Sequence, residues 1–402
     1  MPHSSALQSL VRAHAKEELF LIAEAGTNHN GSLDTAKAMV DAASAAGAAA
    51  IKFQYVIASE ILHPKTGLVS LPGGSIPLFE RFRELECPVS FYRDLKDYAD
   101  RKKILFLCTP FGPKSAEELG RMGVAAFKIA SPEVTYFSLL GRVAEFRRPL
   151  LLSTGVTELA DLRQVRNYLK AFPELENNFT FLHCITQYPA PEHEYNLLLL
   201  LSLPHLLNLK VPVGLSDHTL DAFFIPKVAY TISRLANRPL ILEKHLTLDK
   251  KGTGLDDPIA IDQNELSQLV SQVKQLSRTI QPQKSCEEEW RQEMKEGVLE
   301  SVTRLLPEYS RERIASALGD GVKALAPSEA GNYLTTRRSL RAIRDISKDE
   351  RLDDTNSGYL RSEKNLSPGI FPVPEGLPKG TVARTLIKDG EAITLDKLRA
   401  RI

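Results

Sequence analysis

Eight short apolar segments in the first two-thirds of the chain constrain its fold more than any other feature of the sequence. They are residues 19–26, 49–54, 104–110, 125–131, 149–155, 179–185, 211–217 and 239–247. Between them lie segments with helical spacing and charged faces, such as residues 32–47 and 157–172. Strands that are apolar almost throughout and alternate with amphipathic helices indicate parallel strands covered on both sides. We therefore predict an α/β fold, a (β/α)₈ barrel over residues 1–281.

The polar residues of these segments gather where each segment ends. They are Glu24, Lys52 with Gln54, Thr109, Lys128 with Ser131, Ser153 with Thr154, His183, Ser216 with Asp217 and His218, and Glu243 with Lys244 and His245. Ionisable groups at the end of a core strand are costly to desolvate unless they pair, coordinate a metal or meet a ligand. In a barrel these ends converge on one mouth, where active sites lie. The pattern predicts that this mouth is the functional site.

Two histidines end neighbouring predicted strands, His218 in "GLSDHT" and His245 in "EKHLTLD". Neutral imidazole is a common ligand of divalent ions, and two imidazoles leave open positions for substrate and water. Each histidine alone could instead bond only a neighbouring group. For the pair we predict metal binding.

Two lysines, Lys52 and Lys128, also end strands, and Thr109 and several serines flank them. Two cations and several hydroxyls in a concave site suit a small, multiply charged anion such as a phosphate or carboxylate. Either lysine could instead pair with Glu24 or Glu243, or form a Schiff base as in a lysine-dependent aldolase.

Two carboxylates, Glu24 in "AEAGTNHNG" and Glu133 after "KIASP", are candidates for acid–base catalysis. They could orient sugar hydroxyls, assist a metal or move protons. Either could also only neutralise a lysine.

Composition excludes several other classes of function. The 51 basic and 50 acidic residues give a net charge of +1, which provides no general attraction to nucleic acid or to an anionic membrane. The longest apolar run, residues 196–209, is too short to span a bilayer, and the N-terminal residues do not read as a secretory signal. We expect a cytoplasmic protein without a nucleic-acid or membrane partner.

The rest of the chain is organised differently. The connection over residues 55–90 is longer than an ordinary loop and predicts a lid or a substrate loop. Residues 282–335 are charged and helical, and we interpret them as a linker. Residues 336–402 alternate Val, Ile and Leu with charges around Gly and Pro, which predicts a small β-rich domain.

The ordered motifs resemble those of the N-acetylneuraminate (sialic acid) synthase family. They are "AEAGTNHNG", "IKFQ", "CTPF", "FKIASPE", "LLSTG", "LHCITQYP", "GLSDHT", "EKHLTLD" and "RRSL". The resemblance implies a barrel followed by an antifreeze-like (SAF) β-clip domain, and a homodimer in which that domain caps the partner's site. It also implies condensation of phosphoenolpyruvate with N-acetylmannosamine or a related hexosamine, giving a nonulosonic acid and phosphate. The divalent cofactor implied is Mn²⁺, with Mg²⁺ or Co²⁺ as alternatives.

The same resemblance assigns roles to individual positions. His218 and His245 match the metal ligands, and the catalytic set is Glu24, Glu133, Lys52 and Lys128. Positions around phosphoenolpyruvate are Lys52, Thr109, Lys128, Ser131, Ser153 and Ser216. Positions around the sugar are Glu24, Gln54, Tyr188 and Asp256, and Thr186 in "LHCITQYP" is a further substrate-binding position. For the arginine of the cap, "LRSEKNLSPG" offers Arg361 or Lys364.

Two other functions remain open on the sequence. Another phosphoenolpyruvate-condensing or Schiff-base aldolase barrel would carry similar strand ends. A homologue that binds a sugar without catalysis is the alternative of a different class, although such a protein has no need to retain both histidines and both lysines.

Overall fold

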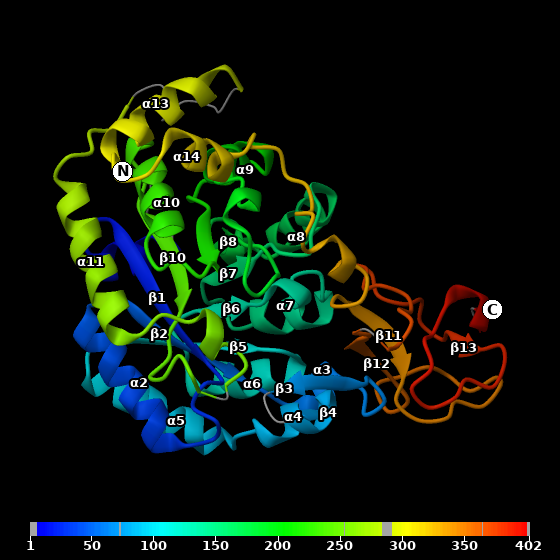
Figure 1. Ribbon diagram of the computed structural model, residues 1–402. Coiled ribbons are helices and arrows are strands. Elements are labelled where there is room, and N and C mark those ends of the chain that lie inside the picture. The colour runs from blue at the N-terminus through cyan, green and yellow to red at the C-terminus, as the bar shows by residue number, and fades with distance from the viewer. Residues whose placement is uncertain (1–5, 72–73, 253, 284–291, 364, 400–402) are drawn as a thin grey trace.

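A closed barrel of parallel strands forms the main body of the computed structural model, which describes residues 6–71, 74–252, 254–283, 292–363 and 365–399. The strand order around the barrel is β1-β10-β9-β8-β7-β6-β5-β2 (Figure 1). The strands are β1 (Leu19–Gly26), β2 (Ala50–Tyr55), β5 (Leu105–Pro110), β6 (Phe127–Ile129), β7 (Leu150–Ser153), β8 (Phe179–His183), β9 (Gly214–Asp217) and β10 (Leu240–His245). The predicted (β/α)₈ barrel is confirmed.

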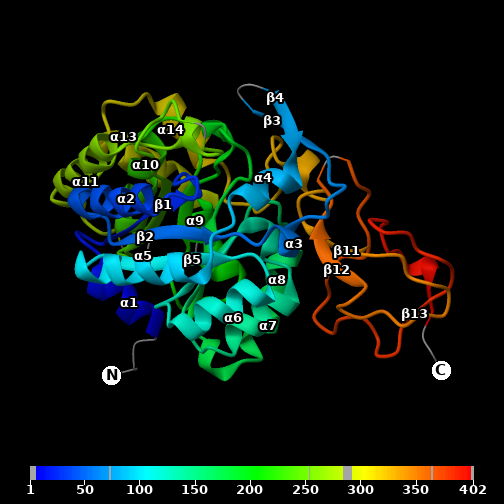
Figure 2. The same ribbon diagram turned by 90° about the horizontal axis from the view of Figure 1, so that it is seen from below.

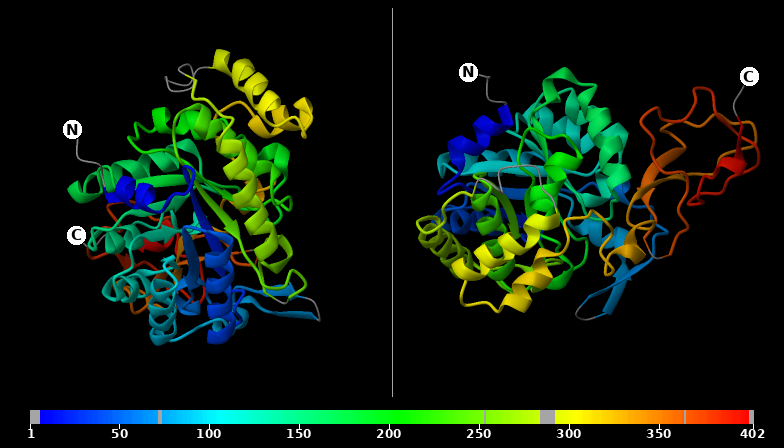
Figure 3. Two further views of the ribbon diagram at one scale, coloured as in Figure 1. Left: turned by 90° about the vertical axis from the view of Figure 1, so that its left-hand side faces the viewer. Right: turned by 90° about the horizontal axis from the view of Figure 1, so that it is seen from above.

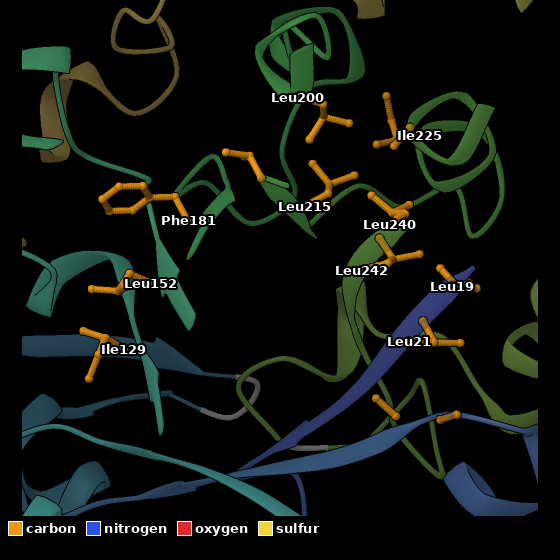
Figure 4. Close-up of a cluster of buried hydrophobic side chains, with 14 of the residues drawn as sticks. Leu19, Leu21, Ile129, Leu152, Phe181, Leu200, Leu215, Ile225, Leu240 and Leu242 are labelled. Carbon is orange, nitrogen blue, oxygen red and sulfur yellow. The ribbon is translucent and has the colours of Figure 1, made fainter. Parts of the chain in front are cut away.

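Helices follow the barrel strands and cover their outer faces. They are α2 (Leu33–Ala46), α5 (Val89–Arg101), α6 (Pro113–Met122), α7 (Phe137–Ala144), α8 (Leu159–Lys170), α9 (Leu199–Leu206), α10 (Phe224–Leu235) and α11 (Gln263–Ser277). The first of these, α2, begins where the Ser32 side chain accepts the amide hydrogen of Thr35, and it ends at Gly47, whose φ of 88° suits glycine. Figure 4 shows part of the apolar layer between strands and helices, including Leu21, Leu152 and Ile225.

Side chains alternate between the two sides of the barrel wall, as the pleat requires. Leu240 and Leu242 face the helices, whereas Ile241 faces the barrel interior. The inward positions of β1 and β10 change from apolar to polar toward the carboxyl end: Phe20, Ile22 and Glu24 in β1, and Ile241, Glu243 and His245 in β10. Helix α1 (Ala6–His14) contributes Leu7 and Val11 to the interior cluster at the opposite end. The polar groups therefore concentrate at one mouth.

The long connection after β2 forms helix α3 (Ala58–Ile61), a hairpin of β3 (Leu68–Leu71) and β4 (Gly74–Pro77), and helix α4 (Leu78–Glu84). It contacts the C-terminal part of the chain. Lys65 Nζ lies 3.0 Å from a carboxylate oxygen of Asp389, and His63 Nε2 lies 3.0 Å from the other oxygen. The connection thus contacts the C-terminal part through His63 and Lys65, and its role as a lid or a substrate loop stays a prediction.

The C-terminal residues form two small antiparallel sheets, β11 (Arg338–Ala342) with β12 (Ser357–Arg361) and β13 (Val382–Ala383) with β14 (Leu398–Arg399). They have a small apolar core of their own around Leu340, Ile346 and Ile387. This unit lies beside the barrel next to α3 and the β3–β4 hairpin (Figure 2). The β-rich architecture agrees with the sequence pattern, whereas its antifreeze-like character stays a prediction.

The segment before this unit packs on the barrel. Helices α13 (Lys295–Leu305) and α14 (Arg311–Leu318) contribute Val298, Val302 and Ile314 to the main core, and Figure 3 shows these helices, in yellow, against the barrel. Residues 295–318 of the segment interpreted as a linker are therefore part of the barrel's outer layer. Among the residues that the structure describes, none of the helices combines the length and apolar character needed to cross a membrane.

Candidate active site

The lysines of the mouth are held by two carboxylates. Lys52 Nζ lies 2.7 Å from Glu24 and 3.6 Å from Glu243, and Lys128 Nζ lies 3.0 Å from Glu243. All four side chains are at least 94% buried. Burial would lower the pKa of Lys52, but Glu24 and Glu243 outweigh it and raise that pKa above its usual value. The two lysines lie together as the sequence predicts and pair with Glu24 and Glu243, as the alternative has it, whereas their binding of an anion stays a prediction.

The predicted hydroxyl groups surround these charges. Thr109 Oγ1 accepts a hydrogen bond from Lys52 Nζ at 3.2 Å, and Ser216 Oγ donates to Glu243 at 3.0 Å. Within the described part of the chain, Ser153 Oγ and Thr186 Oγ1 are buried and have no hydrogen-bond partner. Because buried hydroxyls are normally satisfied, unsatisfied ones at a strand end indicate a place for a polar ligand.

The two predicted metal ligands lie together. The rings of His218 and His245 have centroids 5.3 Å apart, and Tyr188 stacks on His218 at 4.3 Å. Nδ1 of His218 lies 2.7 Å from the carbonyl oxygen of Ile185, which fixes the ring and leaves Nε2 for a ligand. Burial lowers the pKa of His218, and burial together with His218 lowers that of His245 well below its usual value. Both imidazoles are thus neutral.

The donor set suits an ion that is completed by substrate or water. Among the described residues no group of three or more His, Cys, Asp and Glu side chains forms a metal site by itself. His245 Nδ1 is buried without a hydrogen-bond partner and lies 3.5 Å from Asp256. Two imidazoles with one carboxylate nearby fit a divalent ion with open positions, as the sequence predicts.

The residues predicted around a sugar also reach the mouth. Gln54 Nε2 donates to Glu24 at 2.8 Å. Burial, followed by repulsion from Glu24, raises the pKa of Asp256 to about 6. The next residue, Asp257, accepts hydrogen bonds from Thr247 Oγ1 at 2.6 Å and from the Gly254 amide at 2.7 Å, so its carboxylate holds the loop that presents Asp256.

Three polar strand-end residues expected in the ring around the mouth face the other side of the wall. Lys244 donates to Asp217 at 2.6 Å, and both side chains are fully buried outside the barrel interior. His183 follows Phe181 on the outward-facing side of β8. The expectation was wrong for these residues because alternation along a strand sends neighbouring side chains to opposite faces.

Glu133 occupies a separate centre at the rim. Arg338 Nε donates to it at 2.9 Å, and Arg361 donates through Nε and Nη2 to both of its oxygens at 2.8–3.0 Å. Ser131, in the same turn, accepts a hydrogen bond from the amide of Gly155 at 3.0 Å. Arg361 therefore reaches Glu133 within one chain, and Lys364 lies outside the described residues.

Sequence reasoning named Glu243 as a possible partner of either lysine, and its carboxylate lies 3.0 Å from Lys128 Nζ and 3.6 Å from Lys52 Nζ. Two other buried side chains near the mouth, Arg338 and Glu329, were missed. Arg338 is fully buried and also donates to carbonyl oxygens of Ile61 and Phe111. Glu329 lies in the segment interpreted as a linker, where no local pattern marked it.

The chain is a (β/α)₈-barrel protein whose strands carry two lysines, two imidazoles and unsatisfied hydroxyl groups toward one mouth, which is where the active sites of such barrels lie. Comparison with known proteins identifies its family. Residues 39–285 match the NeuB family model, and the chain belongs to the NeuB family.

Relatives in this family span nearly the whole chain. The N,N'-diacetyllegionaminic acid synthase of Campylobacter jejuni is 29% identical over 355 residues, covering 87% of this chain and 92% of the relative. The crystal structure of the spore coat polysaccharide biosynthesis protein SpsE of Bacillus subtilis is 28% identical, with a TM-score of 0.73 over 96% of both chains. The sialic acid synthetase of Leptospira borgpetersenii, crystallised with citrate, is 29% identical, with a TM-score of 0.54 over 66% of this chain and 88% of that chain.

Proposed function

We propose that this chain condenses phosphoenolpyruvate with N-acetylmannosamine or a related hexosamine to form a sialic-acid-type nonulosonic acid and phosphate. The observation that carries the proposal is that Lys52 and Lys128 share a closed mouth with the paired imidazoles of His218 and His245. Membership of a family that includes synthases of legionaminic and sialic acids supports it.

The lysines receive the anionic donor. Phosphoenolpyruvate carries a phosphate and a carboxylate, so it can replace Glu243 as the partner of the Lys128 ammonium. Ser153 and Thr186 supply the hydroxyl groups that have no partner in this structure. The chain thus orients the enol carbon toward the sugar side of the mouth, and this positioning contributes much of the acceleration.

The imidazoles face the sugar. His218 and His245 would hold a divalent ion, Mn²⁺ as first choice with Mg²⁺ or Co²⁺ as alternatives, and when bound this ion would polarise the aldehyde of the open-chain sugar. Glu24, Gln54 and Asp256 lie on the same side of the mouth and can orient sugar hydroxyls.

The reaction then proceeds by carbon–oxygen cleavage. Carbon 3 of phosphoenolpyruvate attacks the aldehyde carbon, and the aldehyde oxygen gains a proton. Water adds its hydroxyl group to carbon 2, and the resulting tetrahedral intermediate releases phosphate as its hydroxyl becomes the ketone. The ammonium groups of Lys52 and Lys128 stabilise the phosphate as its charge grows.

The pairing of the lysines argues against a Schiff-base aldolase. A nucleophilic lysine must be a free amine, whereas Lys52 has a raised pKa and Lys128 contacts a carboxylate. Reductive trapping with borohydride and pyruvate tests this alternative directly, and we expect no adduct.

The test of the proposal is phosphate release from phosphoenolpyruvate with Mn²⁺ and a panel of N-acetylmannosamine, its 6-phosphate and a 6-deoxy diamino hexose. We expect release with one of these sugars, its loss after chelation, and a fall of at least about 10²-fold in His218→Ala and His245→Ala. Release that persists in both variants or after chelation would overturn the role of the imidazoles, and none with any sugar would overturn the proposal.

For the assembly, we propose a homodimer in which the C-terminal unit covers the partner's mouth. The in-chain contact of Arg361 with Glu133 makes a same-chain cap the competing arrangement. Mixing His245→Ala chains with Arg361→Ala chains distinguishes them: partial recovery of activity supports a shared site, and no recovery supports the same-chain cap.

A further inference from the structure

A buried carboxylate from outside the barrel strands holds two loops of the mouth. Glu329 follows α14 and is 1% exposed. Its Oε2 accepts hydrogen bonds from the amides of Val156, after β7, at 3.0 Å and of Thr186, after β8, at 2.8 Å. Its Oε1 accepts from the amide of Ala326 at 3.3 Å. One side chain thus fixes the loops that follow two neighbouring strands.

A second buried residue of the same segment acts on the first loop. Lys323 is 7% exposed, and its Nζ donates to the carbonyl oxygen of Thr154 at 3.1 Å. The same segment therefore binds the peptide groups on both sides of Gly155. Lys323 binds the carbonyl oxygen of Thr154, and Glu329 binds the amide of Val156.

Gly155 lies where three loops meet. Its amide donates to Ser131 Oγ at 3.0 Å, and a Cβ on it would lie only 2.0 Å from Thr186 Oγ1 and 2.9 Å from Ser131 Oγ. This close approach leaves no room for a side chain at position 155, so the backbone there packs directly against Ser131 and Thr186 of the other two loops.

Three hydroxyl groups of this region are candidates for binding a polar ligand. Ser153 Oγ, Thr154 Oγ1 and Thr186 Oγ1 are buried without a partner in the part of the chain that the structure describes. The Thr186 hydroxyl oxygen is three bonds from its own amide nitrogen, through Cα and Cβ, and Glu329 accepts a hydrogen bond from that amide. The carboxylate therefore fixes the backbone from which this hydroxyl projects.

We propose that Glu329 is a positioning residue for the phosphoenolpyruvate side of the mouth, acting through the amides of Val156 and Thr186. The inference rests on the proposed function. A negative oxygen suits this position because two amide donors converge on it and a third meets the other oxygen, and hydrogen bonds to charged acceptors are the stronger ones.

The test compares Glu329→Ala and Glu329→Gln with the unaltered chain, measuring phosphate release while each substrate is varied in turn. In Glu329→Ala we expect the KM for phosphoenolpyruvate to rise about tenfold or more, because two buried amides lose their acceptor. The KM for the sugar should change by less than about twofold. Glutamine can keep one oxygen facing both amides, so Glu329→Gln should recover most of the affinity.

Further variants separate positioning from general destabilisation. Lys323→Met should raise the same KM, which keeps the idea testable if Glu329→Ala does not fold. Glu192→Gln is the control, since the Glu192 carboxylate pairs with Arg313 of the same outer segment. It should leave both KM values unchanged.

The outcomes distinguish the two proposals. The positioning role alone is overturned if the unaltered chain is active but the KM for phosphoenolpyruvate does not change in Glu329→Ala and Lys323→Met. It is also overturned if the KM values for both substrates rise equally in these variants. An unaltered chain that releases no phosphate with any sugar would overturn the proposed function and this inference with it.

Discussion

Two buried carboxylates, Glu243 and Glu133, each lie between two cations, yet they differ in what holds them. Glu243 accepts a hydrogen bond from Lys128 and lies 3.6 Å from Lys52 Nζ, and both lysines are on barrel strands. Glu133 accepts from two arginines that flank the β11–β12 hairpin of the C-terminal unit. The first group lies inside the mouth, and the second lies where the barrel and the C-terminal unit meet.

The difference teaches what each cluster is suited to do. An ammonium is a compact charge on a flexible stem, so its partner can be exchanged for an anionic ligand. A guanidinium forms a planar fork, and Arg361 uses it on both oxygens of Glu133 while Arg338 also binds backbone carbonyls. We infer that Glu243 occupies the place of a ligand and that Glu133 fastens two parts of the chain.

The most severe test of this comparison is Glu133→Ala. It would leave the fully buried Arg338 without its carboxylate, which should cost about 3–5 kcal/mol of unfolding free energy. Denaturant unfolding measures this loss, and faster proteolysis of the C-terminal unit should accompany it. Glu350→Ala removes the half-buried carboxylate that pairs with the exposed Arg344, and as a control it should have a much smaller effect. Equal effects of the two changes would contradict the fastening role.

Lys128→Met tests the other cluster. Removing one of the two ammoniums should lower kcat/KM for phosphoenolpyruvate by about 10²-fold, on the scale of losing one charge-stabilising donor, with little change in melting temperature. Lys227→Met is a suitable control, because Lys227 is also largely buried but pairs with Glu308 on the outer side of the barrel. A similar loss in the control would show that the effect is not specific to the mouth.

Arg361→Lys tests whether the stabilising contact with Glu133 requires the planar guanidinium group or only a positive charge. Lysine keeps the charge but reaches only one point of the carboxylate, so we expect a loss of about 1–2 kcal/mol in unfolding free energy. Denaturant titration measures it. No loss would mean that any cation can fasten the C-terminal unit.

Glu243→Gln is expected to have the smallest effect and the opposite sign. If Glu243 competes with a ligand for the lysines, the neutral amide should tighten the binding of inorganic phosphate by roughly fivefold, or about 1 kcal/mol. Calorimetric titration of the folded protein with phosphate tests this. Weaker binding would show that Glu243 supports the anion site instead of occupying it.

The barrel could be predicted because its information is local. Each strand has its own apolar run and each helix its own spacing, and the polar ends of Lys52, Lys128, Ser216 and His245 follow from the same pattern. Predicted strand limits differ from the observed ones by at most a few residues. The pairing of His218 with His245 followed from the neighbouring positions of their strands.

The rest depends on contacts between residues far apart in the chain. Arg338 and Glu133 are separated by 205 positions, and Glu329 and Thr186 by 143. Periodicity carries no signal for such pairs. The outward position of Lys244 could have been predicted, because side chains alternate between the two faces of a strand. The prediction was wrong because all polar residues at a strand end were assigned to the same face.

The alternation along β10 also makes the site sensitive to chain length. Deleting one residue after Ile241 would move every later side chain of the strand to the opposite face of the barrel wall. Lys244 would then point into the barrel interior, and the imidazole of His245 would point toward the helices. Natural variation in this strand should therefore change its apolar side chains more readily than the spacing between Ile241, Glu243 and His245.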